Sequence, residues 1–267
     1  MFRLLALDLD GTTLTASHQI PDRTKAAIQT VRERGVTPVI VTGRMQRSAA
    51  PYAEELGLKG LPMVTYNGAF VSLFPSTEPL YHEPLPLEAA RKLAAFCERE
   101  GIYLHGYQDD QLCIPAQTPE AIAYQGLAGV EGRVVGALST WLGAPQTKMI
   151  AISTAEQIAE LKGIVQELLG DAANVTISNP TYLEVMSSKV SKGKALAAVA
   201  ERLGVKQSEV LAIGDGLNDL EMLRWAGTGV AMGHAHEQLK AQADWVTTEG
   251  PGDGVWEAIR HFGLVEA

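Results

Sequence analysis

The chain has few of the residues that build disulfide or zinc sites, since only Cys97 and Cys113 are cysteines among its 267 residues. Two isolated cysteines give neither a disulfide framework nor a zinc-binding spacing, and they are typical of buried thiols in a reducing cytosol. Basic residues are also few: 22 Lys and Arg face 31 Asp and Glu, for a net charge of −9. This balance argues against nucleic acid or an anionic membrane as a partner, because both require clustered Lys and Arg. An anionic ligand must therefore be small and bound locally.

Long apolar runs are also missing, because none reaches the roughly 18 residues of a membrane span. The first three residues lead directly into a predicted strand without a signal-peptide pattern, so we expect a cytoplasmic protein. Aromatic residues make up 6% of the chain and are too scattered to indicate a base-stacking platform. The hydrophobic content of 46% nevertheless suffices for one large domain or two modest ones.

The stretch that organises the chain lies near its beginning, where an apolar run, residues 4–7, ends in Asp8 and Asp10. A buried strand that runs into a turn would place both carboxylates at its carboxyl end, where open α/β sheets bind ligands. Two carboxylates this close repel each other, so we expect a cation or a shared proton between them. The alternative is that both aspartates only serve the turn or cap a helix.

The pattern that follows predicts a doubly wound parallel sheet. An amphipathic helix ending at Gly35 precedes a β-branched strand, residues 36–41, and a second helix continues to Gly57. A third strand over 62–66 is followed by Asn67-Gly68, a strong hairpin signal. Strands and helices that alternate over short links form parallel sheets with right-handed crossovers.

After about residue 80 the regular alternation of strands and helices gives way to short hairpin-like strands interleaved with helices. This change predicts an inserted α+β module over residues 81–186, between core segments 1–80 and 187–267. Within the module, residues 126–136 hold four glycines and no clear periodicity. The predicted helices are 87–100 and 156–169, and the predicted strands are 102–107, 111–115, 147–153, 174–178 and 182–185. Alternation of helix and strand resumes afterwards, with a helix over 191–203 and an apolar strand over 210–213.

Polar residues end two further strands of the predicted core: Thr42 and Gly43 end one, and Asp215, Asn218 and Asp219 end another. Carboxylates from several strand ends suit Mg²⁺ with a substrate phosphate. A hydroxyl and an open backbone N–H near a helix start are typical of anion sites, although an ordinary strand-to-helix link is the alternative for Thr42 and Gly43.

Lys192 begins a predicted helix, where a cation opposes the helix dipole unless an anion lies in front. A phosphate there would explain it, with Lys189 and Lys194 as alternatives and a solvated role open for each. His234 and His236 follow another strand end, and we interpret them as loop residues rather than ligands, since oxygen ligands account for the metal.

These motifs, in this order, resemble the haloacid dehalogenase (HAD) superfamily, and more narrowly its Cof-type phosphatases, subfamily IIB. The resemblance spans nearly the whole chain and implies a Rossmann-like core with an inserted C2B-type cap between the second and third motifs. It rests on Asp8–Thr12, Thr42–Arg44, Lys192 and Gly214–Asp219, supported by Tyr66–Ala69, Tyr182–Val185 and Val230–Gly233.

The resemblance also implies a role for each motif residue. Asp8 would be the nucleophile, and Asp10 the general acid and then base, with its carbonyl on the metal. Asp8 and Asp215 would hold Mg²⁺ through their carboxylates, while Asp219 would orient the metal's waters. The residues expected to contact the phosphoryl group are Thr42, Gly43, Lys192, Asn218 and the backbone N–H of Leu9.

The implied function is a Mg²⁺-dependent phosphatase of small phosphorylated metabolites, such as sugar phosphates or a phosphorylated cofactor, acting through an aspartyl-phosphate as a monomer or weak homodimer. Asp10 favours phosphoryl transfer, because dehalogenases of the superfamily lack this second acid. A phosphomutase of the same subfamily and a catalytically silent phosphate-binding protein are the alternatives. The insertion would decide the substrate by closing over the site.

Overall fold

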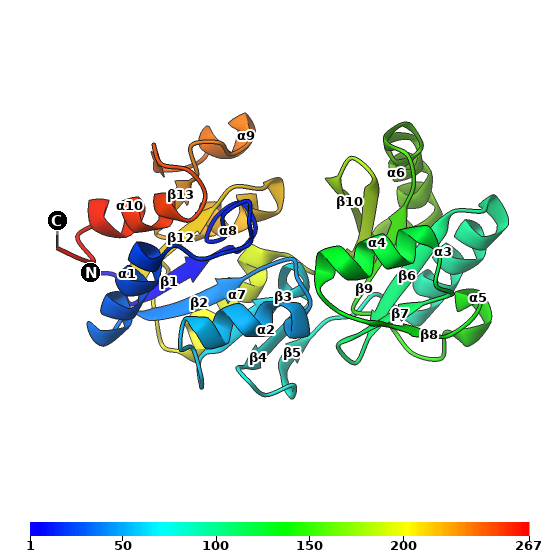
Figure 1. The fold of residues 1–267 in the computed structure, drawn as a ribbon, viewed down its shortest axis with the longest axis horizontal. Helices are drawn as coiled ribbons and strands as arrows, with labels where there is room; N and C mark the ends of the chain where they lie inside the picture. Colours follow the sequence, from blue (N-terminus) through cyan, green and yellow to red (C-terminus); the bar gives the residue numbers. More distant parts are fainter. Residues whose placement is uncertain (267) are drawn as a thin grey trace. The chain divides into compact units, whose positions relative to one another are not determined.

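A computed structural model describes residues 1–266, and the chain divides into two compact units (Figure 1). We call them the core unit, residues 1–44, 49–80 and 191–267, and the inserted unit, residues 45–48 and 81–190. Each has its own hydrophobic cluster.

The core unit contains one eight-stranded sheet in the order β14-β13-β12-β1-β2-β3-β4-β5. Its strands are β1 Leu4–Leu7, β2 Thr37–Val41, β3 Pro62–Thr65, β4 Phe70–Leu73, β5 Pro79–His82, β12 Val210–Gly214, β13 Thr228–Ala231 and β14 Trp245–Val246. Its helices are α1 Asp22–Glu33, α2 Gln46–Glu55, α7 Lys192–Arg202, α8 Leu220–Trp225, α9 Glu237–Lys240 and α10 Asp253–His261. The first three residues of α2 belong to the inserted unit as defined above.

Strand β1 lies at the centre of this sheet because all four of its residues are apolar and buried, as a two-sided parallel strand requires. It pairs in parallel with β2 and with β12, which comes from the other end of the sequence and lies beside it in Figure 1. Leu7 is in register with both Ile40 and Ile213, so the three strands end together. The residues that follow them therefore meet at one edge.

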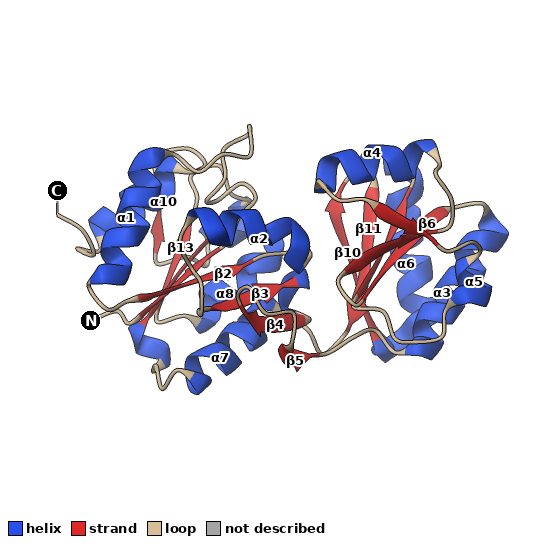
Figure 2. Ribbon diagram, turned by 60° about the horizontal axis from the view of Figure 1, so that its bottom comes forward, coloured by secondary structure: helices blue, strands red, loops and turns tan. Residues whose placement is uncertain are grey.

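Helices cover both faces of the core sheet: α1, α2 and α10 lie on one face, and α7 and α8 lie on the other (Figure 2). This confirms the predicted doubly wound architecture. No helix within residues 1–266 combines the length and apolar character that crossing a membrane would need.

The predicted hairpin is also confirmed, since β4 runs antiparallel to β3. The connection is a short 3₁₀ turn, Tyr66–Gly68, in which Asn67 has φ 54° and Gly68 has φ 100°. Glycine suits the second value because other residues rarely adopt it.

The inserted unit holds a six-stranded sheet in the order β10-β11-β9-β6-β7-β8. One face, with Leu104, Met149 and Leu183, packs on helices α3, α5 and α6. The strands are β6 Tyr103–Gln108, β7 Gln111–Ile114, β8 Gly132–Val134, β9 Lys148–Ile152, β10 Ala173–Asn179 and β11 Tyr182–Ser187. The helices are α3 Leu87–Glu100, α4 Pro119–Ala128, α5 Leu138–Trp141 and α6 Ala155–Leu169.

Helix α4 begins before the glycine-rich stretch, in a segment for which the sequence predicted no element. Thr118 caps α4 by accepting a hydrogen bond from the N–H of Ala121, Pro119 occupies the first turn, and Gly129 ends the helix in a left-handed conformation. These are ordinary helix boundary signals. Helix α4 lacked a clear apolar stripe because it buries only Ala121 and Tyr124.

Candidate active site

Three carboxylates meet at the carboxyl edge of the core sheet. Asp8 follows β1, and Asp215 and Asp219 follow β12. Each offers one oxygen, and these oxygens all lie within 4.8 Å of one another. The common end of β1 and β12 thus brings together residues more than two hundred positions apart in sequence.

Lys192 joins this cluster from the first turn of α7. Its Nζ lies 2.7 Å from Asp8 Oδ1 and 2.6 Å from Asp219 Oδ1, and its side chain is 1% exposed. Helix α7 begins there because the hydroxyl of Ser191 accepts a hydrogen bond from the N–H of Lys194. Of the three lysines considered from the sequence, Lys192 is the one in this cluster.

Asp219 fixes the loop that carries Asp215. Its Oδ2 accepts hydrogen bonds from the backbone N–H groups of Asp215 and Gly216, at 3.0 and 2.9 Å, while its Oδ1 accepts from Lys192. A side chain at Gly214 would collide with it, because an added Cβ would lie 2.5 Å from Asp219 Cγ. Both oxygens of Asp219 therefore already have donors from the protein.

The charges of the cluster do not balance, since three carboxylates face one ammonium group. Burial raises the pKa of Asp8 well above its usual value, Lys192 opposes this, and the charges of Asp219 and Asp215 add to the rise. Burial and Asp219 likewise raise the pKa of Asp215. The two acids hold the pKa of Lys192 above its usual value despite its burial, so it stays charged. An all-oxygen donor set with excess negative charge fits a hard divalent cation such as Mg²⁺.

Asp215 has two further neighbours. The hydroxyl of Thr12 donates a 2.9 Å hydrogen bond to its Oδ1, and Nε2 of His234 lies 3.6 Å from its Oδ2. Gly11, at φ 74°, leaves room for this carboxylate, since an added Cβ would lie 2.3 Å from Oδ2. His234 is in a loop as expected, but no sequence pattern indicated that this loop reaches Asp215. His236 instead caps α9.

Thr42, Gly43 and Asn218 surround Asn67, which the sequence identified only as a turn residue. The side-chain NH₂ of Asn218 donates a 2.9 Å hydrogen bond to Asn67 Oδ1, and the N–H of Asn67 donates to the carbonyl of Thr42. An added Cβ at Gly43 would lie 2.9 Å from the same Oδ1. Beyond the Asn-Gly turn and the Tyr66–Ala69 resemblance, no sequence signal marked this position, because its φ of 54° is a property of the folded backbone.

Asp10 is not one of the three clustered carboxylates, and its own carboxylate pairs with Arg44. Nε of Arg44 lies 2.7 Å from Oδ2, and an Nη of Arg44 lies 2.5 Å from Oδ1. No role for Arg44 followed from the sequence. The metal contact of the Asp10 carbonyl and the phosphoryl contact of the Leu9 N–H stay predictions.

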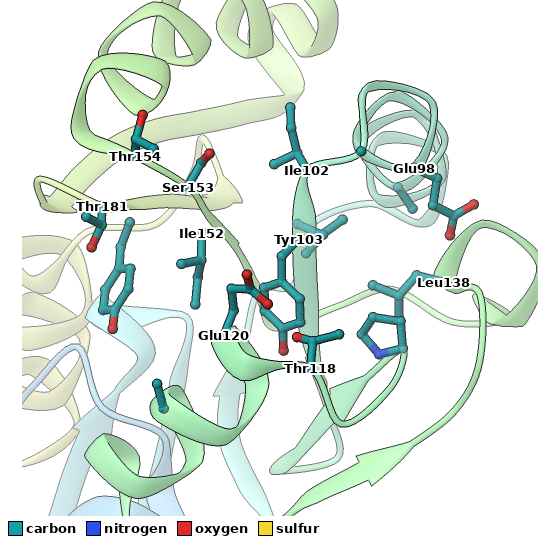
Figure 3. A pocket seen from close by; sticks show the side chains of 16 residues that line it. Glu98, Ile102, Tyr103, Thr118, Glu120, Leu138, Ile152, Ser153, Thr154 and Thr181 are labelled. Atoms are coloured by element: carbon teal, nitrogen blue, oxygen red, sulfur yellow. The ribbon is translucent and has the colours of Figure 1, made fainter.

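A separate cavity of about 730 Å³ lies within the inserted unit (Figure 3). Glu98 and Glu120 line it together with Tyr103 and Thr154, and none of its lining residues is a Lys, Arg or His. It contains no residue of the carboxylate cluster. A cavity with two acids and no cationic side chain is unsuited to a phosphate ester.

Known proteins with similar sequences and folds include several phosphatases. A putative phosphatase of Haemophilus influenzae is 31% identical over 90% of this chain and 88% of its own length. A Cronobacter sakazakii protein named HMP-PP phosphatase is 30% identical over 91% of this chain and 88% of its own. The solved structure of a HAD subclass IIB sugar phosphatase superposes with a TM-score of 0.85 at 27% identity, covering 98% of this chain and all of that one.

The doubly wound fold and the similarity to these relatives in sequence and structure define the protein as a phosphatase. The sequence model of the haloacid dehalogenase-like hydrolases matches residues 5–259. The chain belongs to this family, as its motifs indicated.

Proposed function

We propose that the protein is a Mg²⁺-dependent phosphatase that hydrolyses small phosphorylated metabolites through an aspartyl-phosphate. The observation that carries this proposal is the cluster of Asp8, Asp215 and Asp219, in which the buried Lys192 pairs with Asp8 and Asp219. It supplies a nucleophile, a fixed positive charge and a set of oxygen ligands within a few ångströms.

Asp8 and Asp215 would hold the metal through their carboxylates, with the carbonyl of Asp10. Bound Mg²⁺ would neutralise negative charge on the phosphoryl oxygens and on Asp8. Asp219, whose oxygens are already engaged by Lys192 and two backbone N–H groups, would hold the Asp215 loop and orient the metal's waters.

In the first half-reaction a carboxylate oxygen of Asp8 attacks phosphorus, the bond from phosphorus to the ester oxygen breaks, and Asp10 gives that oxygen a proton. In the second, Asp10 takes a proton from water, which attacks the same phosphorus and releases phosphate from Asp8. Dividing the displacement in this way replaces one difficult step by two easier ones.

The phosphoryl group would be bound by Lys192, Thr42, Gly43, Asn218 and the N–H of Leu9. Phosphoryl transfer needs little beyond positioning and charge stabilisation, so donors held rigidly around the phosphate account for most of the acceleration. The contact between Asn218 and Asn67 supports this, because it fixes one of these donors.

We propose that residues 81–186 act as the lid that selects the substrate. The names of the relatives, a sugar phosphatase and an HMP-PP phosphatase, support small phosphate esters as the substrate class. Cys97 and Cys113 are free and buried, which agrees with a cytoplasmic location. A monomer or weak homodimer is expected.

The variant Asp8→Asn tests the nucleophile. We expect phosphate release from a panel of sugar phosphates to require Mg²⁺ in the wild type and to fall by at least about 10³-fold in the variant, with an unchanged circular dichroism spectrum. Asp22→Asn is the matched control, because Asp22 is an exposed acid at the start of α1.

A near-normal rate in Asp8→Asn would remove Asp8 as the nucleophile. Transfer of phosphate between positions of one sugar without release would instead identify a mutase, and an inactive but phosphate-binding wild type would identify the silent alternative.

A further inference from the structure

The guanidinium group of Arg44 donates hydrogen bonds to both oxygens of the Asp10 carboxylate. The guanidinium donates from Nε to Oδ2 at 2.7 Å and from Nη2 to Oδ1 at 2.5 Å, the paired geometry that arginine forms with carboxylates. The guanidinium group also lies over the ring of Tyr52, whose centre is 5.1 Å from Arg44 Cζ, a distance at which a cation and an aromatic ring attract each other. The backbone N–H of Arg44 donates to Thr42 Oγ1 at 3.2 Å, so Arg44 is anchored beside the predicted phosphate-binding turn.

This pairing conflicts with the role proposed for Asp10. A carboxylate with both oxygens bound to a permanently charged guanidinium is poorly placed to meet the ester oxygen of a substrate. The Asp10 side chain is 49% exposed and the Arg44 side chain 15% exposed, so the pair lies at the surface of the site rather than sealed within it. For Asp10 to reach the leaving group, the guanidinium must exchange this carboxylate for another anion.

We propose that Arg44 is a specificity-determining residue that favours substrates with a second anionic group, a carboxylate or another phosphate, beside the phosphoester being cleaved. This inference rests on the proposed function and deepens it. The second anion pairs with the guanidinium in place of Asp10, and the released carboxylate turns toward the ester oxygen. Binding of the preferred substrate therefore frees the residue that acts on its leaving group.

The surroundings of Arg44 favour such an exchange. His18 Nδ1 lies 3.1 Å from Nη2 of Arg44 and 3.8 Å from Asp10 Oδ1, so a third polar group is present at the same point. Tyr52 keeps the guanidinium in place after Asp10 leaves, which lowers the entropic cost of binding an incoming anion. Because carboxylate and phosphate both match the guanidinium fork, the proposal applies to either.

Two matched substrate pairs test the proposal on the full-length protein with Mg²⁺. In the first pair, 3-phosphoglycerate carries a carboxylate where glycerol 3-phosphate carries a hydroxymethyl group. In the second, fructose 1,6-bisphosphate carries a phosphate that fructose 6-phosphate lacks. We expect the wild type to prefer the doubly anionic member of at least one pair by roughly 10- to 100-fold in kcat/KM, as one charge-assisted hydrogen-bonded contact provides. The pair that responds identifies the second anion.

Arg44→Gln should bring this preference close to one, with most of the loss on the doubly anionic substrate. Arg44→Lys should retain part of it, because lysine keeps the charge without the fork. The matched control is Arg23→Gln, since Arg23 also pairs with an aspartate, Asp253, and lies over an aromatic ring, Trp256, neither of which belongs to the carboxylate cluster. It should retain the wild-type preference.

The proposal is overturned if the wild type shows no preference in either pair, or if Arg44→Gln slows both members of a pair equally. Should Arg44→Gln fail to fold, the preference of Arg44→Lys decides: a reduced value supports the proposal and an unchanged value overturns it. If the wild type releases no phosphate from any of the four esters, the proposed function fails together with this inference. Release with a preference independent of Arg44 overturns the inference alone.

Discussion

The negative charge of Asp215 destabilises the folded protein, because the carboxylate is partly buried beside Asp219, and a bound cation would offset this repulsion. Burial and the nearby charge of Asp219 raise its pKa above the usual 3.8, although Thr12 and Lys192 oppose the shift. A carboxyl whose pKa is raised by folding binds protons more tightly in the folded state. Its contribution to stability therefore falls as the pH rises above about 3.8 and through the raised value.

Asp215→Asn should therefore stabilise the metal-free protein near neutral pH. The amide keeps an oxygen to accept from Thr12 but removes the charge. We expect its melting temperature to exceed that of the wild type by a margin that grows from pH 4 to pH 7, and expect Mg²⁺ to raise it much less than in the wild type. Thermal unfolding with and without Mg²⁺ measures both.

Asp22→Asn is the control with the opposite sign, because Lys25 lowers the pKa of that exposed carboxyl and no gain with pH is expected. A margin for Asp215→Asn that shrinks as the pH rises would contradict the account of Asp215.

The acidic and lysine positions of the site could be predicted from the sequence, whereas their neighbours could not. Asp8 and Asp215 follow apolar strands directly, so the sheet alone determines where they lie. Asn67, Arg44 and His234 lie on turns whose course depends on tertiary packing. Sequence patterns carry little information about such contacts.

At the scale of elements, the hairpin between β3 and β4 supports the beginning of helix α7. Gly68 in its turn lies so close that an added Cβ would be 2.4 Å from the carbonyl oxygen of Ser191, the residue that caps α7. Lys192 follows at once, so this contact helps to set where its ammonium group lies.

Gly68→Ala should therefore destabilise the core unit and weaken phosphate binding together. Strain at φ 100° costs about 1–3 kcal/mol and the clash a similar amount again. Gly60→Ala separates the two effects, because Gly60 has φ 82° but no atom within 4 Å of its added Cβ.

Denaturant unfolding and the inhibition constant of inorganic phosphate are the measurements. We expect Gly60→Ala to lose stability alone and Gly68→Ala to lose both. Equal behaviour of the two variants would mean that the contact with Ser191 does not position Lys192.

The elements that were predicted followed from apolar periodicity, whereas several short elements and helix α4 were not predicted. The predicted strands of the core sheet and helix α3 were recognised because each buries a continuous run or stripe. Helix α4 was missed because only two of its ten residues are buried, so its capping residues were its main signal.

At the scale of the whole molecule, hydrophobic burial is divided between two clusters. One is formed by core-unit residues from Leu4 to Leu264, and the other by inserted-unit residues from Leu85 to Val185. All three carboxylates of the candidate metal site belong to the core unit. A cation bound there would stabilise the core unit directly.

We therefore expect calorimetry to resolve two unfolding transitions, of which Mg²⁺ raises only one. At 100 times its dissociation constant, Mg²⁺ adds about 2.7 kcal/mol to the unit that binds it, which corresponds to roughly 5–10 °C. Hydrogen exchange assigns the transitions, because added protection should appear in β1 and β12 and be absent from β6 and β9. The two strand pairs belong to different clusters, so they report separately. A single transition that moves as a whole with Mg²⁺ would show that the units unfold together, because a ligand of one unit stabilises the other only when the two are coupled.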